Sequence, residues 1–86
     1  MTPPVAVQWM LDELSAHGEL YQDAVASEMI SYGDDALAYY DDAGNACVGK
    51  KLLAEFKKVT PNAVWIRGGK YWRLREDGDE PGRSQY

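Results

Sequence analysis

Residues 64–76 read VWIRGGKYWRLRE, and this stretch decides how the C-terminal part of the chain folds. The Gly68–Gly69 pair separates two short runs of strand-forming residues, a pattern typical of a tight hairpin whose turn uses positive φ angles. In that register Trp65 stands opposite Trp72 on one face of the hairpin. The sequence therefore predicts a two-stranded hairpin over residues 63–75, held against the rest of the fold by its aromatic side chains.

Two helices are predicted in the N-terminal half from apolar residues at helical spacing. The first covers residues 3–17, with Thr2 as the N-cap before two prolines and Gly18 as the left-handed stop. Residues 19–21 are too few for anything but a short extended connector. After it, the helical period resumes and predicts a second helix over residues 22–32.

A third helix is predicted over residues 46–59, after a turn-rich segment at residues 34–44 whose middle has no clear assignment. Asn45 is expected to cap this helix. Apolar residues at helical spacing give the helix one buried side, and the opposite side carries four lysines around Ala54. These lysines are Lys50, Lys51, Lys57 and Lys58.

The order of these elements is helix, connector, helix, turn, helix and hairpin, which is the order in a winged helix-turn-helix domain. The expected fold is therefore mainly α within the α+β class, with three helices and a C-terminal two-stranded β-hairpin as the wing. Residues 1–76 are expected to form this one domain, followed by an acidic, loosely ordered tail at residues 77–86.

Three stretches carry a resemblance to a known family: WMLDELSAHGELYQDAVASEMI, DDAGNACVGKKLLAEFKKVT and VWIRGGKYWRLREDGDEPGR. The chain resembles a bacterial family of small, uncharacterised, winged-helix-like proteins, some of which are encoded on integron gene cassettes. The likeness covers nearly the whole chain, and its most specific parts are LYQ, the GN turn, the LLAEF helix, the YWR strand and EPGR. A more distant likeness is to winged-helix modules that precede restriction or chromatin-associated domains and are thought to bind DNA. The family resemblance implies no established activity and so informs the fold more than the function.

Charge is divided unevenly along this acidic chain, whose net charge is -5. Residues 1–45 carry nine acidic side chains and neither Lys nor Arg. Residues 46–75 carry eight Lys or Arg side chains and a single acid, Glu55. This basic segment contains both the third helix and the hairpin, which in a winged helix are the recognition helix and the wing.

The basic segment predicts DNA binding through the third helix and the hairpin. Its cations would neutralise phosphates, while the small Ala54 would let the helix approach base edges. The expected phosphate contacts are Lys57, Lys58, Arg67, Lys70 and Arg73, and the expected base-proximal positions are Lys50, Lys51 and Ala54. The expected partner is double-stranded DNA, bound by a homodimer because one small module has limited contact area.

Other interpretations of the basic segment stay open. Its cations could balance the acids of residues 1–45 within one fold. The charge division could also serve a protein–protein interaction or self-association module on the same fold, without catalysis. The aromatic residues of the hairpin could stack on bases instead of packing on the core. A further hypothesis is that EDGDE, residues 76–80, folds back over the basic face and mimics nucleic acid there.

Other functional classes lack a motif in this sequence. No Walker loop, dinucleotide fingerprint, nucleophile elbow or paired metal-ligand spacing occurs, so we expect no enzyme, cofactor, metal or small-molecule substrate. A calcium loop starting at Asp41 fails because Ala43 and Leu52 fall at ligand positions, and the neighbouring aspartates are expected to form turns and cap helices. His17 and Cys47 are expected to be structural. No apolar run is long enough to span a membrane, and the expected location is the cytoplasm.

Overall fold

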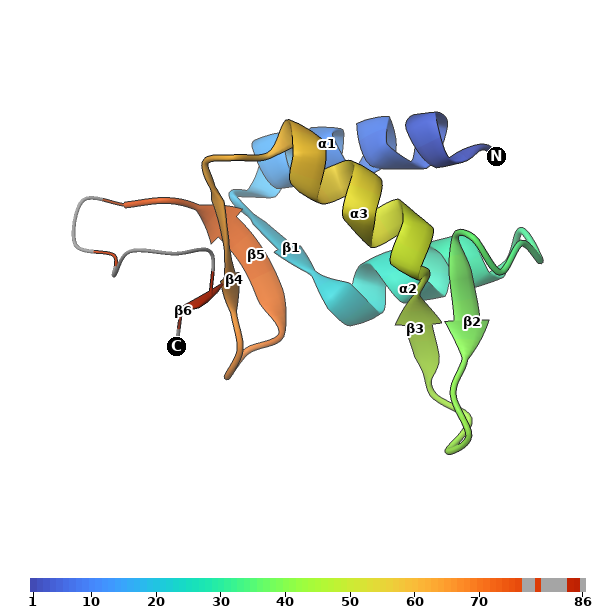
Figure 1. Cartoon of the computed structure of the whole chain (residues 1–86). Coiled ribbons are helices and arrows are strands. Elements are labelled where there is room, and N and C mark those ends of the chain that lie inside the picture. The colour runs from blue at the N-terminus through green and yellow to red at the C-terminus, as the bar shows by residue number, and fades with distance from the viewer. Residues whose placement is uncertain (77–78, 80–83, 86) are drawn as a thin grey trace.

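Strands stand between and after the helices along the chain in the computed structural model, which describes residues 1–76, 79 and 84–85 (Figure 1). The helices are α1 (Pro3–His17), α2 (Gln22–Ile30) and α3 (Lys50–Val59). One sheet contains, in spatial order, β1 (Glu19–Tyr21), β5 (Tyr71–Leu74), β4 (Ala63–Ile66) and β6 (Ser84–Gln85). The second sheet pairs β2 (Ala38–Tyr40) with β3 (Ala46–Val48). In Figure 1, α1 and α3 pack together in the upper part, with the larger sheet at the left and the β2–β3 hairpin at the right.

The first helix has the bounds that the sequence predicts. Thr2 occupies the N-cap position, and two prolines stand in the first turn, where their missing N–H groups leave no helical hydrogen bond unmade. Gly18 ends the helix with φ 76° and donates its N–H to the carbonyl of Leu14 at 2.8 Å. One apolar stripe of α1 is buried against the core, and it consists of Ala6, Val7, Met10 and Leu14.

The predicted connector at residues 19–21 is a strand, β1, which pairs antiparallel with β5 and buries Leu20 at its centre. The second helix, α2, ends at Ile30, two residues before the predicted end. Tyr32 and Gly33 donate their N–H groups to carbonyls three residues back, so the last turn tightens and the α-helical pattern stops.

The prediction of one helix over residues 46–59 is wrong in its first part. Ala46–Val48 is strand β3, paired antiparallel with β2 across a turn. The boundary between β3 and α3 is not visible in the spacing of apolar residues, because Val48 fits the helical spacing of α3. In the structure Val48 is buried, but it belongs to the strand. Gly49, rather than Asn45, occupies the N-cap position of α3.

The β4–β5 hairpin has the predicted register, with Trp65 opposite Trp72. Its turn differs from the expected one, because neither glycine of Gly68–Gly69 has a left-handed φ, whereas Lys70 has φ 54°. The turn covers residues 67–70, so both cations that flank the glycines belong to the turn itself.

Aromatic packing joins α3 to the larger sheet. Phe56 is fully buried, and its ring meets that of Trp72 edge to face with centroids 5.4 Å apart. The Trp65 and Trp72 rings are 4.7 Å apart, and Leu20 stands opposite Trp72 on the other side. The prediction that this aromatic pair holds the hairpin to the core is confirmed.

The expectation of a mainly α winged helix-turn-helix domain with a C-terminal wing is wrong. Strands interleave with the helices and form two sheets, which makes this a small α+β fold. The C-terminal hairpin is the middle of the four-stranded sheet, between β1 and β6, instead of a projecting two-stranded wing. Three of the strands have only three residues, too few for an alternating pattern to stand out in sequence.

The predicted loosely ordered tail, residues 77–86, lies mostly outside the described residues. Within it, Ser84–Gln85 pairs parallel with β4, and Asp79 forms an ion pair with Arg73. In the described part of the chain, no helix is long and apolar enough to cross a membrane.

Candidate nucleic-acid interface

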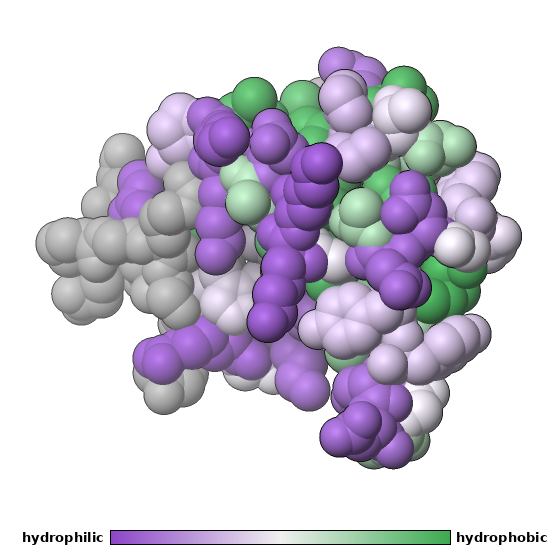
Figure 2. Space-filling model, turned by 45° about the vertical axis from the view of Figure 1, so that its right-hand side comes forward, coloured by the Kyte–Doolittle hydropathy of each residue, from purple (hydrophilic) through white to green (hydrophobic). Residues whose placement is uncertain are grey.

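The exposed side of α3 carries most of the predicted contacts. Leu52 and Phe56 are fully buried, and the residues on the opposite side of the helix face solvent. We call this side the lysine face, and it consists of Lys50, Lys51, Ala54, Lys57 and Lys58. Hydrophilic side chains dominate the middle of the surface in Figure 2, and apolar residues gather at its upper and right-hand margins.

Few of these cations have an acidic partner. Lys58 pairs with Glu55 at 3.4 Å, but both side chains are largely exposed, so the pair is weak. The other lysines of the lysine face form no ion pair with any described residue.

Gly49 determines where α3 begins. Its N–H donates to the carbonyl of Leu37 at 2.8 Å. A Cβ on residue 49 would lie 2.6 Å from the carbonyl carbon of Ala36 and 2.9 Å from the carbonyl oxygen of Asp35, closer than side chains approach backbone. Glycine therefore lets the chain pass tightly against this turn, and the contact sets the position of Lys50.

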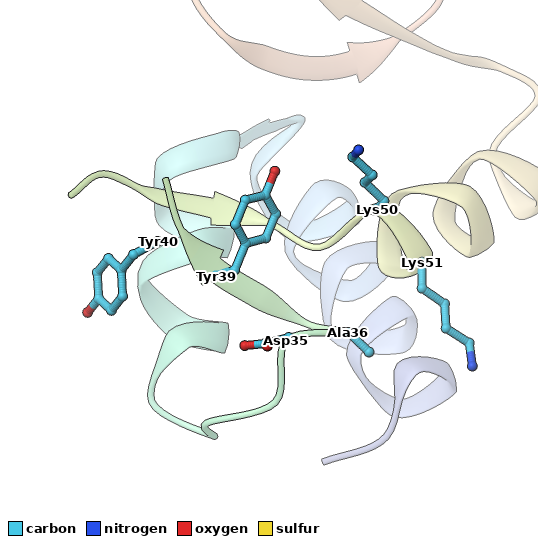
Figure 3. A pocket seen from close by; sticks show the side chains of 6 residues that line it. All are labelled: Asp35, Ala36, Tyr39, Tyr40, Lys50 and Lys51. Carbon is cyan, nitrogen blue, oxygen red and sulfur yellow. The ribbon is translucent and has the colours of Figure 1, made fainter. Parts of the chain in front are cut away.

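An open recess of about 670 Å³ lies beside the start of α3. Its lining residues are Asp35, Ala36, Tyr39, Tyr40, Lys50 and Lys51. Tyr39 and Lys50 both line the recess and project to the same side, whereas Tyr40 and Lys51 point in other directions (Figure 3). The sequence prediction missed both tyrosines, although two strand-forming aromatic residues directly before a turn are a signal for a hairpin.

The remaining cations lie away from the recess. Lys57 and Lys58 stand in the last turn of α3, where cations suit the helix dipole. Arg67 and Lys70 are exposed in the turn that joins β4 to β5. Apart from Arg73 in β5, the predicted cations thus form three groups, at the two ends of α3 and at the tip of the hairpin.

Arg73, the other predicted phosphate contact, already binds an anion of its own chain. Its guanidinium donates to both carboxylate oxygens of Asp79, at 2.9 and 2.6 Å, and the two side chains are only 19% and 8% exposed. Hydrogen bonds from Arg73, and then from the N–H of Glu76, lower the pKa of Asp79 from 3.8 to about 2. This two-point contact uses the same donor geometry with which arginine binds phosphate. One acid of the tail therefore does fold back onto a basic residue.

The aspartates between residues 34 and 42 form turns, as predicted, but they do not cap the described helices, whose N-cap residues are Thr2, Tyr21 and Gly49. Asp34 Oδ1 accepts the N–H of Ala36 at 2.9 Å. Asp41 Oδ1 accepts the N–H groups of Asn45 at 2.8 Å and Ala43 at 3.0 Å, and these bonds lower the pKa of Asp41. Within the described residues, no three His, Cys, Asp or Glu side chains are placed to hold a metal ion.

His17 and Cys47 have local partners. His17 Nε2 lies 3.1 Å from Glu13 Oε2, one turn earlier on α1. The half-buried thiol of Cys47 lies 3.6 Å from the carbonyl oxygen of Asn45 and 3.8 Å from Asp41 Oδ2. Cys47 lies in strand β3 and not at the start of the helix, and the structural roles expected for both residues stay predictions.

A family model matches most of the chain. The model describes a family of unknown function, DUF6953, and it matches residues 2–74. The chain belongs to this family. The lysine face, the recess and the hairpin of this DUF6953 chain all lie within the matched range, whereas Asp79 and β6 lie beyond it. No curated protein and no solved structure matches the chain. The resemblance to proteins of integron cassettes stays a prediction.

Proposed function

We propose that this DUF6953 protein binds DNA through the lysine face of α3, with the tip of the β4–β5 hairpin as a further contact. The observation that supports the proposal is that four exposed lysines, three on one face of α3 and one at the hairpin tip, have no ion-pair partner among the described residues: Lys50, Lys51, Lys57 and Lys70. Cations grouped in this way on a chain of net charge -5 attract a polyanion locally, while the remaining charge repels it. We expect the protein to act in the cytoplasm.

The expected affinity depends strongly on salt. Each phosphate neutralised by a lysine contributes about -0.9 to the slope of log affinity against log salt. Four or five lysine contacts then correspond to a loss of affinity of roughly 150- to 500-fold between about 50 and 200 mM salt. Such a slope separates direct phosphate contacts from binding by apolar surface.

The decisive experiment removes two cations and compares the result with an equal change of net charge elsewhere. The test variant is Lys50→Gln with Lys51→Gln, and the matched control is Ser15→Glu with Ser27→Glu, at exposed positions of α1 and α2. We expect the test variant to lose affinity for labelled DNA and to reduce the salt slope by about 2, while the control keeps the wild-type slope. Equal affinities for the two variants would refute the mapping onto α3.

A second candidate function is binding to a protein partner or to another copy of the chain. The observation that favours it is a groove between α1 and α3, lined by Pro4, Val7, Gln8, Leu11, Glu55 and Val59. Val59 is 53% exposed there, so apolar surface adjoins the lysine face. Light scattering over a range of salt concentrations tests self-association. A dimer that dissociates with salt supports pairing of the acidic and basic surfaces, a dimer that persists supports the groove, and a monomer at every concentration excludes self-association.

A further inference from the structure

We propose that the recess beside the start of α3 takes an unpaired nucleobase stacked on Tyr39, so that the preferred ligand of the lysine face is single-stranded DNA. This inference rests on the proposed function and specifies its ligand. The juxtaposition of Tyr39 and Lys50 carries it, because these two residues offer a ring for a base and a cation for the adjoining phosphate.

The ring of Tyr39 packs against no other aromatic ring of the described residues. It takes part in none of the three aromatic pairs formed by described residues. Its hydroxyl group donates no hydrogen bond to any residue in the described part of the chain. The half-buried ring of Tyr39 borders the recess, so a base that stacks on it there breaks none of these aromatic pairs and no hydrogen bond of the Tyr39 hydroxyl to a described residue.

The size of the recess is sufficient for one nucleotide of a longer strand. A volume of about 670 Å³ falls within the range of pockets that bind small ligands. The recess is open on the solvent side, so a polymer can enter and leave it. The bases of a duplex are paired and stacked on one another, whereas those of a single strand are free to stack on an aromatic ring.

Charge orients the strand in the recess. Lys50 projects to the same side as Tyr39, and Asp35 lines the recess at another point. A phosphate next to Asp35 would meet a like charge, whereas a phosphate next to Lys50 meets an opposite one. The backbone of the strand is thus expected on the Lys50 side, continuous with the lysine face.

Fluorescence anisotropy with the full chain tests this inference. The probes are a labelled single strand of about 12 nucleotides, its duplex, and an abasic strand with the same number of phosphates. The variants are Tyr39→Leu, which keeps apolar bulk but loses the ring, and Tyr39→Phe, which keeps the ring. Tyr32→Leu is the matched control, since Tyr32 is 44% exposed but does not line the recess.

We expect the wild type to prefer the single strand over both other probes. Tyr39→Leu should bind the single strand about 5- to 150-fold more weakly, the range that stacking of one base contributes, and should no longer distinguish it from the abasic strand. Tyr39→Phe and Tyr32→Leu should stay close to the wild type. Melting temperatures of all variants exclude loss of the fold as the cause.

Two outcomes would overturn the inference, and they can be told apart. If Tyr39→Leu matches the wild type on the single strand, or if the wild type prefers the duplex, the stacking site is refuted. In either case, salt-dependent binding that requires Lys50 and Lys51 would still support the proposed function. If no probe binds at about 50 mM salt, the proposed function fails and the stacking site fails with it.

Discussion

Replacing Gly49 by alanine tests how the start of α3 is held in place. Gly49 is buried, it donates its N–H to the carbonyl of Leu37 at 2.8 Å, and it lies against the backbone of Asp35 and Ala36. The substitution adds a single methyl group. Because the atoms that this group meets are backbone atoms, no side chain can rotate away to make room.

The size of the effect follows from these contacts. Three backbone atoms lie at 2.9 Å or less from the Cβ position, so the turn at Ala36 must shift. Overpacking of this kind costs about 1–3 kcal/mol, and a lengthened hydrogen bond to Leu37 costs about 0.5–1.5 kcal/mol more. A stiffer unfolded chain offsets about 0.4–1 kcal/mol of that. The free energy of unfolding should therefore fall by about 2 kcal/mol, which for a domain of this size lowers Tm by about 8–16 °C.

Urea unfolding followed by tryptophan fluorescence measures this change, with Gly68→Ala as the matched control. At Gly68 a Cβ meets no heavy atom within 4 Å, and φ is not left-handed there. The Gly68→Ala substitution should leave the free energy of unfolding of the protein unchanged, or raise it by up to about 1 kcal/mol. Equal stability of the two variants would show that the chain does not depend on the close approach at Gly49.

Two further predictions concern the core and the tail. Phe56→Ala removes a fully buried ring that packs edge to face on Trp72, and should lower the unfolding free energy by about 3–5 kcal/mol in the same assay; a loss under about 1 kcal/mol would contradict this packing. Asp79→Asn should lower Tm near pH 7, because the pKa of Asp79 is about 2 in the folded protein, below its ordinary value of 3.8. The higher Tm of the wild type, relative to Asp79→Asn, is fully present above about pH 4 and should vanish as the pH falls through about 2. A difference in Tm that does not change with pH would refute the role of the Arg73–Asp79 pair.

The parts of the fold predicted correctly are those whose pattern repeats within one element. The 15 residues of α1 hold four turns of apolar spacing between a proline start and a glycine stop, so both ends are visible in sequence. The hairpin register followed from the two glycines and the tryptophans around them. The strand β3 was missed because three residues show no period, and because Val48 fits the helical spacing that continues into α3.

The candidate site, too, could be predicted from the sequence only in part. Periodicity placed the lysines on the exposed side of α3, and the structure has them exposed. The recess could not be predicted, because it exists only after β2 has paired with β3 and brought Tyr39 beside the first residue of α3. Gly49 is decisive for this arrangement, but its role depends on backbone atoms of residues that come close only in the folded chain.

Arg73 shows why the charge of a residue does not establish what it can bind. In the sequence it is one of eight Lys or Arg residues in residues 46–75, and nothing there distinguishes it from the others as a phosphate contact. In the fold its guanidinium is largely covered and already binds both oxygens of Asp79. A phosphate at Arg73 would have to replace that carboxylate, whereas a phosphate at Lys50 displaces no described residue. Binding should therefore begin at the lysine face, and Arg73 contributes only where the gain from its new contact exceeds the loss of the old one.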